Sequence, residues 1–168
     1  MSQQMLIDRG NRANFSPCKK YRFRLERDWS GSDDAEGVHF CLLNPSTADA
    51  EKPDNTVTRL INFAKAWGFG RMMLSNIFAW RSTDPSELYL PERDPIGADN
   101  DGWILDAAQR CTITVVGWGN HGDLLGRGID VARLLGTSLH CFGVNETGHP
   151  IHPLYLAAST SLTRFPGF

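Results

Sequence analysis

The 168-residue chain contains no apolar run close to the roughly 20 residues that a helix needs to cross a bilayer. Its N-terminus lacks the basic start and long apolar stretch of a secretory signal, so we expect a cytoplasmic protein with no membrane partner. The four cysteines form no CxxC motif and no Cys/His ligand spacing, which predicts buried reduced thiols, no metal site and no cofactor. The formal net charge of −2 excludes a chain that is basic throughout, as strongly electrostatic nucleic-acid binders are.

Basic residues are nevertheless concentrated at the start of the chain. Residues 1–30 contain seven lysines and arginines against three acidic residues, a net charge of +4. Within them, residues 21–27 alternate apolar and charged side chains, which is typical of a strand with one face on the core and one in water. The charged face either keeps this strand solvated, which is the more common use of such a run, or forms a patch that binds phosphate.

Four short apolar runs predict buried strands, and stretches with helical spacing separate them. This alternation of strands and helices predicts a parallel sheet with helices on both faces. We therefore expect a single α/β domain over residues 1–168, with a core at about 21–160. It should have three layers around a central, mainly parallel four-stranded sheet, with the 21–27 strand added as an N-terminal antiparallel edge. The predicted strands are 38–43, 72–77, 112–116 and 138–142, and the predicted helices are 55–67, 99–110 and 124–135.

Polar side chains follow the first three of these strands. Because open α/β sheets bind ligands in the crevice outside the carboxyl ends of their strands, these side chains are expected to line one pocket. Asn44 offers an amide to a substrate or a water, and Asn76 can hydrogen-bond a planar heterocycle. The alternative is that they are turn and helix-capping residues. The polar strand ends comprise Asn44, Pro45, Ser46, Thr47 and Asp49, then Ser75 and Asn76, then Trp118, Asn120 and His121.

A long segment, 79–98, follows the second of the predicted buried strands. Loops of this length in compact domains are usually functional or mobile. Trp80 can stack on a base there, although a tryptophan is more often part of a core. Arg81, which polar residues follow, can engage a phosphate.

Two histidines, each followed by a proline, occur after the last predicted strand. A proline holds the preceding residue in an extended conformation, so His149 and His152 suit the rigid presentation of imidazoles to a cleft. There an imidazole can donate to a developing negative charge or act as a general acid or base. The alternative is a proline-stiffened surface loop.

Six short motifs spread along the chain carry a family resemblance. They are Leu43-Asn44-Pro45-Ser46-Thr47-Ala48-Asp49, Trp67-Gly68-Phe69-Gly70, Asn76-Ile77-Phe78-Ala79-Trp80-Arg81-Ser82-Thr83-Asp84-Pro85, Asp99-Asn100-Asp101, Trp118-Gly119 and His152-Pro153-Leu154-Tyr155. In these motifs the chain resembles a family of bacterial and phage-associated proteins catalogued as domain of unknown function 1643. The resemblance covers nearly all of the chain from Tyr21 onward, and the family name implies no activity.

A remoter likeness concerns the polar strand ends. Leu43-Asn44-Pro45-Ser46, Leu74-Ser75-Asn76 and His152-Pro153-Leu154 are similar in type, order and position to motifs of the uracil-DNA glycosylase superfamily. This resemblance implies a uracil-DNA-glycosylase-like fold and activity on a nucleobase, with cleavage of its N-glycosidic bond. Asn44 replaces the aspartate of the most active members, and the aromatic residue that stacks on the base has no clear match.

The resemblance implies a role for each motif. Asn44 would hold the attacking water, Asn76 would read the base edge and His152 would stabilise charge on the leaving base. Leu154 would act as the apolar wedge if a base were flipped out of a DNA duplex. From the residue patterns and this resemblance taken together, the candidate catalytic residues are Asn44, His152 and Asp49, and the candidate substrate-binding residues are Pro45, Ser46, Thr47, Asn76, Trp80, Arg81, Trp118, Asn120, His149 and Leu154.

Three functions are compatible with these residues. The first is hydrolysis of an N-glycosidic bond in a nucleotide or in DNA. The second is a non-catalytic module that holds a nucleotide or a modified base in the same cleft, which the missing stacking aromatic and the weak basic character favour. The third is an unrelated metal-dependent hydrolase that uses His149, His152 and Asp49. The first requires Asn44, Asn76 and His152 to face a common hollow.

Overall fold

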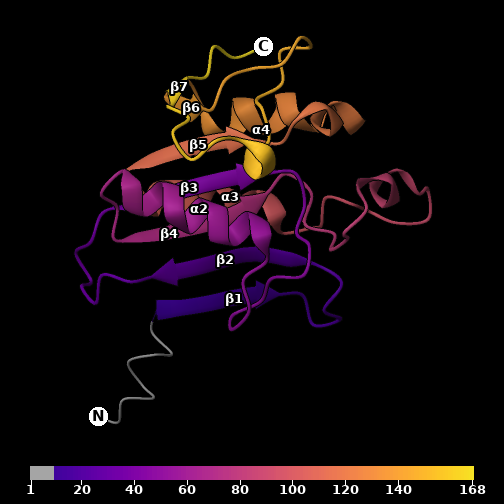
Figure 1. Ribbon diagram of the computed structural model, residues 1–168. Coiled ribbons are helices and arrows are strands. Elements are labelled where there is room, and N and C mark those ends of the chain that lie inside the picture. The colour runs from indigo at the N-terminus through magenta and orange to yellow at the C-terminus, as the bar shows by residue number, and fades with distance from the viewer. Residues whose placement is uncertain (1–9) are drawn as a thin grey trace.

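The computed structural model describes residues 10–168, which fold around one mixed seven-stranded sheet with helices against it (Figure 1). The strands lie in the order β1-β2-β4-β3-β5-β6-β7. They are β1 (Asn11–Phe15), β2 (Arg22–Asp28), β3 (Gly37–Leu42), β4 (Arg71–Asn76), β5 (Ile113–Gly117), β6 (Leu139–Cys141) and β7 (Thr163–Arg164). The helices are α2 (Asn55–Ala66), α3 (Asn100–Arg110) and α4 (Arg127–Leu135), and the 3-10 turns are η1 (Pro85–Tyr89), η2 (Asn120–Gly126) and η3 (Pro153–Tyr155).

The structure confirms the α/β class and changes the extent of the sheet. The four middle strands, β4, β3, β5 and β6, pair in parallel. The prediction of a single added strand is wrong, because antiparallel strands extend the sheet at both ends, β1 and β2 beyond β4 and β7 beyond β6. Neither β1, with the sequence NRANF, nor the two-residue β7 carries an apolar period that a sequence pattern could reveal. The strand β2 therefore lies inside the sheet and not at its edge.

Helices cover both faces of the sheet, which gives the predicted three layers (Figure 1). On one face Leu60 of α2 packs into a core that contains Phe40 of β3. On the other face Ile104 of α3 and Val131 of α4 pack into a second core that contains Cys41. Phe40 and Cys41 belong to different cores because successive residues of a strand point to opposite faces.

Helix starts near the carboxyl edge of the sheet match the prediction in one case and differ from it in another. The first helix begins at residue 55 as predicted: Asp54 is the N-cap of α2 and accepts a hydrogen bond from Val57 N at 2.9 Å, and Asn55 is the first helical residue. The third helix begins at Arg127 and not at residue 124, because the 3-10 turn η2 fills 120–126 and contains two leucines with non-helical dihedral angles.

A β-bulge in β2 controls where its arginines point. Asn14 and Phe15, which are neighbours in β1, stand opposite Arg24 and Arg22, so Phe23 is an extra residue in β2. An extra residue breaks the alternation of side chains between the two faces and re-aims the residues around it. Arg22 and Arg24 consequently contact different parts of the molecule.

The alternating pattern predicted that one face of β2 lies in water. This prediction is wrong, because the arginines of the strand are buried. Arg22, Arg24 and Arg27 are 2%, 8% and 5% exposed. Arg24 pairs with Asp106 of α3, and its guanidinium lies 4.8 Å from the ring centroid of Trp103. Charge alternation alone cannot distinguish such paired, stacked arginines from solvated ones.

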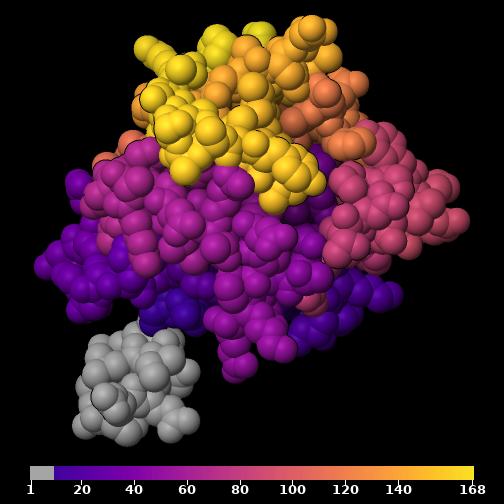
Figure 2. Space-filling view, in the orientation of Figure 1, coloured from indigo at the N-terminus to yellow at the C-terminus, as the bar shows by residue number. Residues whose placement is uncertain are grey.

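The segment that follows β6 crosses the end of the sheet and packs on α2. Figure 2 shows the C-terminal residues, in yellow, lying directly against the surface of the magenta segment that contains α2. Cys41 and Cys141 are buried as predicted, whereas Cys18 is exposed. None of the helices within residues 10–168 has the length and apolar character needed to cross a membrane.

Candidate functional site

The carboxyl ends of three central strands lie side by side. Leu42 of β3 pairs with Asn76 of β4 and with Gly117 of β5, so these residues form one row across the sheet. The backbone pairing between β3 and β4 continues one residue past the end of β4, since Ile77 N donates to the Leu42 carbonyl oxygen at 2.9 Å. The loops that contain most of the predicted site residues therefore start from a common edge, where open α/β sheets bind ligands.

Asn44 lies half-buried two residues beyond this row. Its Nδ2 donates to the carbonyl oxygen of Ser82 at 2.9 Å and to that of Pro45 at 3.2 Å. These bonds hold the loop after β3 against the loop after β4, which is the turn-stabilising role that the sequence left open. Within residues 10–168 no hydrogen bond uses Asn44 Oδ1, so the side chain retains an acceptor for a ligand or a water.

Asn76 contacts a buried arginine that the sequence analysis did not place in the site. Arg22 Nη2 donates to Asn76 Oδ1 at 3.4 Å, and Arg22 Nη1 donates to the Ala48 carbonyl oxygen at 2.9 Å. Arg22 and Asn76 are each 2% exposed. Burial lowers the pKa of Arg22 to about 10, partly offset by the Asp54 carboxylate. The alternation of β2 put Arg22 on a polar face, and only the bulge turns it toward Asn76.

His152 lies next to Gly119, two residues beyond the row, where a Cβ placed on the glycine would be 3.7 Å from the His152 Cβ. Its Nδ1 accepts a hydrogen bond from Leu154 N at 3.2 Å. An accepting Nδ1 carries no proton, so the ring proton of the neutral imidazole is on Nε2. Burial lowers the pKa of His152 to about 4, so the ring is neutral at pH 7.

The Asp54 carboxylate links the two sides of this edge electrostatically. It opposes the burial effect by raising the pKa of both Arg22 and His152. Such an effect requires a charge near both groups, because Coulomb interactions weaken with distance. Asp54 is the N-cap of α2, so the start of this helix contributes negative charge to both groups.

His149, the other proline-preceded histidine, has a structural contact. Its Nδ1 accepts a hydrogen bond from Trp118 Nε1 at 3.2 Å, and its Nε2 lies 3.9 Å from Asp123 Oδ1. Trp118 is 1% exposed and His149 is 5% exposed. Both predicted site residues thus lie inside the protein, where they support the loops instead of lining an open surface.

The loop after β3 uses its other polar groups to hold its own shape. Asp49 Oδ1 accepts from Lys52 N at 2.8 Å and from Glu51 N at 2.9 Å, and these backbone bonds lower the Asp49 pKa. The Pro45 carbonyl oxygen accepts from Ser82 N at 2.9 Å. Pro45 is buried, Ser46 half-buried and Thr47 exposed.

Trp80 and Arg81 have partners on the β1–β2 side of the molecule. The Arg81 guanidinium lies 4.7 Å from the ring centroid of Phe15 and donates to the Lys19 carbonyl oxygen at 3.0 Å. The Trp80 ring lies 4.3 Å from the Arg93 guanidinium. Neither side chain has a contact with Asn44, Asn76 or His152 among these interactions.

Asn120 and Leu154 lie at the border of the site. The exposed Asn120 accepts hydrogen bonds through Oδ1 from Asn145 Nδ2 at 2.6 Å and from Thr147 Oγ1 at 2.9 Å, which ties two loops together. Leu154 lines a hollow of about 530 Å³ along α2, together with Phe63.

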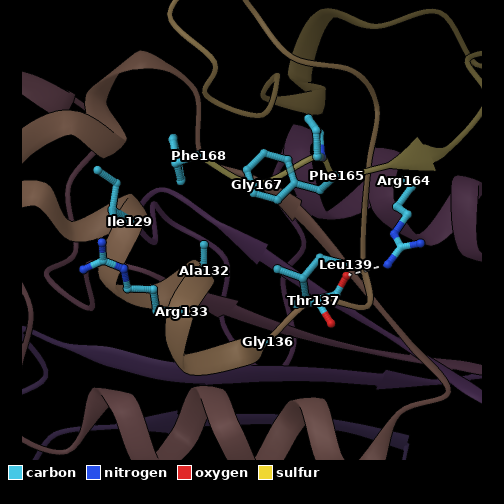
Figure 3. A pocket seen from close by; sticks show the side chains of 11 residues that line it. Ile129, Ala132, Arg133, Gly136, Thr137, Leu139, Arg164, Phe165, Gly167 and Phe168 are labelled. Atoms are coloured by element: carbon cyan, nitrogen blue, oxygen red, sulfur yellow. Dashed lines mark hydrogen bonds between the residues drawn. The ribbon is translucent and has the colours of Figure 1, made fainter.

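A second hollow lies away from the predicted residues (Figure 3). Its volume is about 510 Å³, and it lies between α4 and the C-terminal residues. Figure 3 shows Arg133 and Arg164 on opposite sides of it, with Ala132, Leu139 and Phe165 between them. In the part of the chain that the structure describes, no three His, Cys, Asp or Glu side chains are grouped to hold a metal ion.

Comparison with known proteins identifies a family. No curated protein and no solved structure matches the chain. A family model matches residues 22–154, which run from the first residue of β2 into η3 and include Arg22, Asn44, Asn76 and His152. The match confirms the family resemblance noted in the sequence, and the chain belongs to the family described as "Protein of unknown function (DUF1643)".

Proposed function

We propose that the carboxyl edge of the sheet binds a nucleobase and hydrolyses the N-glycosidic bond that joins it to its sugar. One observation carries the proposal. Among the described residues no hydrogen bond uses Asn44 Oδ1, Asn76 Nδ2 or His152 Nε2, although each side chain is otherwise fixed at this edge. They offer an acceptor and two donors, the set needed for a water and a base.

Asn44 would act on the water. Its amide is held by Ser82 and Pro45, so Oδ1 has a fixed position from which to accept a hydrogen bond from a water molecule. An amide does not take a proton as a carboxylate does, and the nearby Asp49 carboxylate is engaged by backbone N–H groups. The reaction would therefore depend mainly on departure of the base, with the water adding to the sugar carbon as the C–N bond breaks.

His152 would act on the departing base. When the C–N bond breaks, its electron pair goes to the base, and negative charge develops on the ring nitrogen atoms and the carbonyl oxygen atoms of the base. A neutral imidazole with its proton on Nε2 can donate to that charge, and the low pKa of His152 keeps it in this form. The proton released by the attacking water passes to solvent or to the base.

The test is product formation by single-residue variants. Purified protein is incubated with single- and double-stranded oligonucleotides and with nucleosides, and abasic sites or free bases are measured. Asn44→Ala and His152→Ala should each lower the rate by about 10²-fold or more. Matched controls away from this edge are Asn11→Ala, at an exposed position of β1, and His140→Ala, at a half-buried position of β6, which should keep the rate. Unchanged product formation in the Asn44→Ala/His152→Ala double variant rules out the proposal.

A non-catalytic binding module is the second candidate. The observation that favours it is the state of Asp49, the carboxylate of the loop after β3, which closes a turn through Oδ1 and is a weaker base because these bonds lower its pKa. Equilibrium binding separates the two functions. Retained binding of a nucleotide with no product in any substrate class supports the module.

A further inference from the structure

We propose that Arg22 is a positioning residue that fixes which end of the Asn76 amide faces the ligand, so that the site presents the Nδ2 donor and selects a carbonyl oxygen over an amine. This inference deepens the proposed function and rests on its base-binding site. Arg22 itself does not touch the base. It acts through Asn76.

The chemistry of the contact sets the direction of the amide. A guanidinium has only donors, so the Asn76 atom that faces Arg22 Nη2 at 3.4 Å must be the acceptor, Oδ1. Rotation of the amide by 180° would set the Nδ2 hydrogens against the guanidinium hydrogens. Both residues are 2% exposed, so little water is present to compensate for that arrangement.

Arg22 is itself held in place on several sides. Its backbone N donates to the Ala79 carbonyl oxygen at 3.0 Å, and its Nη1 donates to the Ala48 carbonyl oxygen at 2.9 Å. The bulge at Phe23 gives it this direction. Within residues 10–168 Arg22 forms no ion pair, and its buried Nε has no partner. Because no carboxylate is in direct contact with this buried cation, and Asp54 acts on it only from a distance, an apolar side chain would serve packing better.

The backbone of Asn76 is fixed from the other side. Asn100, which is fully buried, donates from Nδ2 to the Asn76 carbonyl oxygen at 2.8 Å. With the main chain and Oδ1 both held, Nδ2 is the one group of Asn76 left for a ligand. The matching ligand group is a carbonyl oxygen, whereas an exocyclic amine would meet it donor against donor.

The binding test compares two ligands that differ at this group and in the protonation of the adjacent ring nitrogen, so the variants are compared with the wild type on the same pair. Uridine 5′-monophosphate and cytidine 5′-monophosphate carry a carbonyl and an amine at the same ring position, and their dissociation constants are measured by titration calorimetry. The wild-type protein should prefer the uridine compound by about tenfold. In Arg22→Met the preference should fall toward unity, because the amide can turn over, and Arg22→Lys, which retains a donor, should keep part of it.

Arg27→Met is the matched control. Arg27 is also a buried arginine of β2, 5% exposed, and it donates to the Asp49 carbonyl oxygen without contacting Asn76. This variant should keep the full preference for the uridine compound. An Arg22→Met protein that binds both ligands with the wild-type ratio overturns the inference.

A stability measurement tests the contact without any ligand. Asn76→Asp places a second acceptor opposite the buried cation, so the urea midpoint should rise in the wild-type background and fall in the Arg22→Met background. A lower midpoint in both backgrounds overturns the inference. If the wild type binds neither nucleotide while this pattern holds, the proposed function fails and the positioning by Arg22 stands.

Discussion

Trp118 Nε1 donates a hydrogen bond to His149 Nδ1 at 3.2 Å, between two buried side chains. Trp118 follows the last residue of β5, and His149 lies three residues before His152. Gly119 N also donates to the Pro150 carbonyl oxygen, at 2.8 Å. These two hydrogen bonds hold the segment that contains His152 against the end of β5. The same contacts therefore stabilise the fold and fix the position of His152 in the candidate site.

Trp118→Phe should lower the free energy of unfolding by about 1–3 kcal/mol, because His149 Nδ1 would be left buried without its donor. Urea denaturation measures the change. Trp29→Phe is the control, since Trp29 is only half-buried and its Nε1 donates to the Phe69 carbonyl oxygen at 3.0 Å, which water can replace. Equal losses in the two variants would contradict a special role for the buried pair.

Two helical glycines should respond in opposite directions to alanine. A Cβ on Gly128 of α4 would lie 2.7 Å from Trp118 Nε1 and 3.0 Å from the Gly122 carbonyl oxygen, so Gly128→Ala should destabilise by about 1–3 kcal/mol. A Cβ on Gly102 of α3 meets nothing within 4 Å, so Gly102→Ala should stabilise by roughly 0.5–1 kcal/mol. Thermal or urea denaturation of both variants checks the prediction, which a gain in Gly128→Ala would refute.

Stability should fall as the pH drops below about 6.5. Burial lowers the pKa of His152 to about 4 and that of His39 to about 3. Between these values and the unfolded pKa near 6.5, the unfolded chain binds more protons, so each histidine contributes a loss of up to about 1.4 kcal/mol per pH unit.

Urea titrations from pH 7 to 4.5 measure this slope. The lower limit avoids Asp49, Asp84 and Asp106, whose pKa values are lowered by hydrogen bonds and whose protonation adds a further loss in stronger acid. His152→Gln should reduce the slope. A slope unchanged in that variant would show that His152 titrates normally in the folded protein.

The Tyr155→Ala variant tests whether a single-stranded oligonucleotide passes over the candidate site. Tyr155 is 92% exposed in η3 beside His152, so Tyr155→Ala should change the free energy of unfolding by less than about 0.5 kcal/mol. If bases of a single strand stack on its ring, an oligonucleotide should bind about tenfold more weakly, with mononucleotide affinity unchanged. Leu154→Ala, at a half-buried position of η3 beside α2, should instead reduce stability. Unchanged oligonucleotide affinity would exclude Tyr155 from the path of a strand.

The sequence by itself determined the order and type of the main elements. The predicted strand 38–43 is observed as Gly37–Leu42, and the predicted helix 55–67 as Asn55–Ala66. These elements were predictable because apolar periodicity is a local property that burial on a sheet or helix face imposes directly. The grouping of Asn44 and Asn76 at one edge followed in turn from parallel strands, whose carboxyl ends must coincide.

Partners of individual side chains were not determined locally. Trp80 and Arg81 follow a strand end as the site requires, yet they pack on Arg93 and Phe15. Asp49 closes a turn with the amides of the residues that follow it. The type of a polar residue limits which hydrogen bonds its side chain can form, and the groups that the fold places around it determine which of them do form.

Only the tertiary structure decided the place of Arg22. The local alternation predicts that Arg22 faces solvent. Pairing of β2 with β1 instead forms a bulge at Phe23, and the guanidinium contacts Ala48 of the loop after β3 and the side chain of Asn76. The direction of that side chain depends on how β1 pairs with β2 and on a loop more than 20 residues away along the chain. Such contacts between distant segments form only when the sheet assembles, so no local period of the sequence contains them.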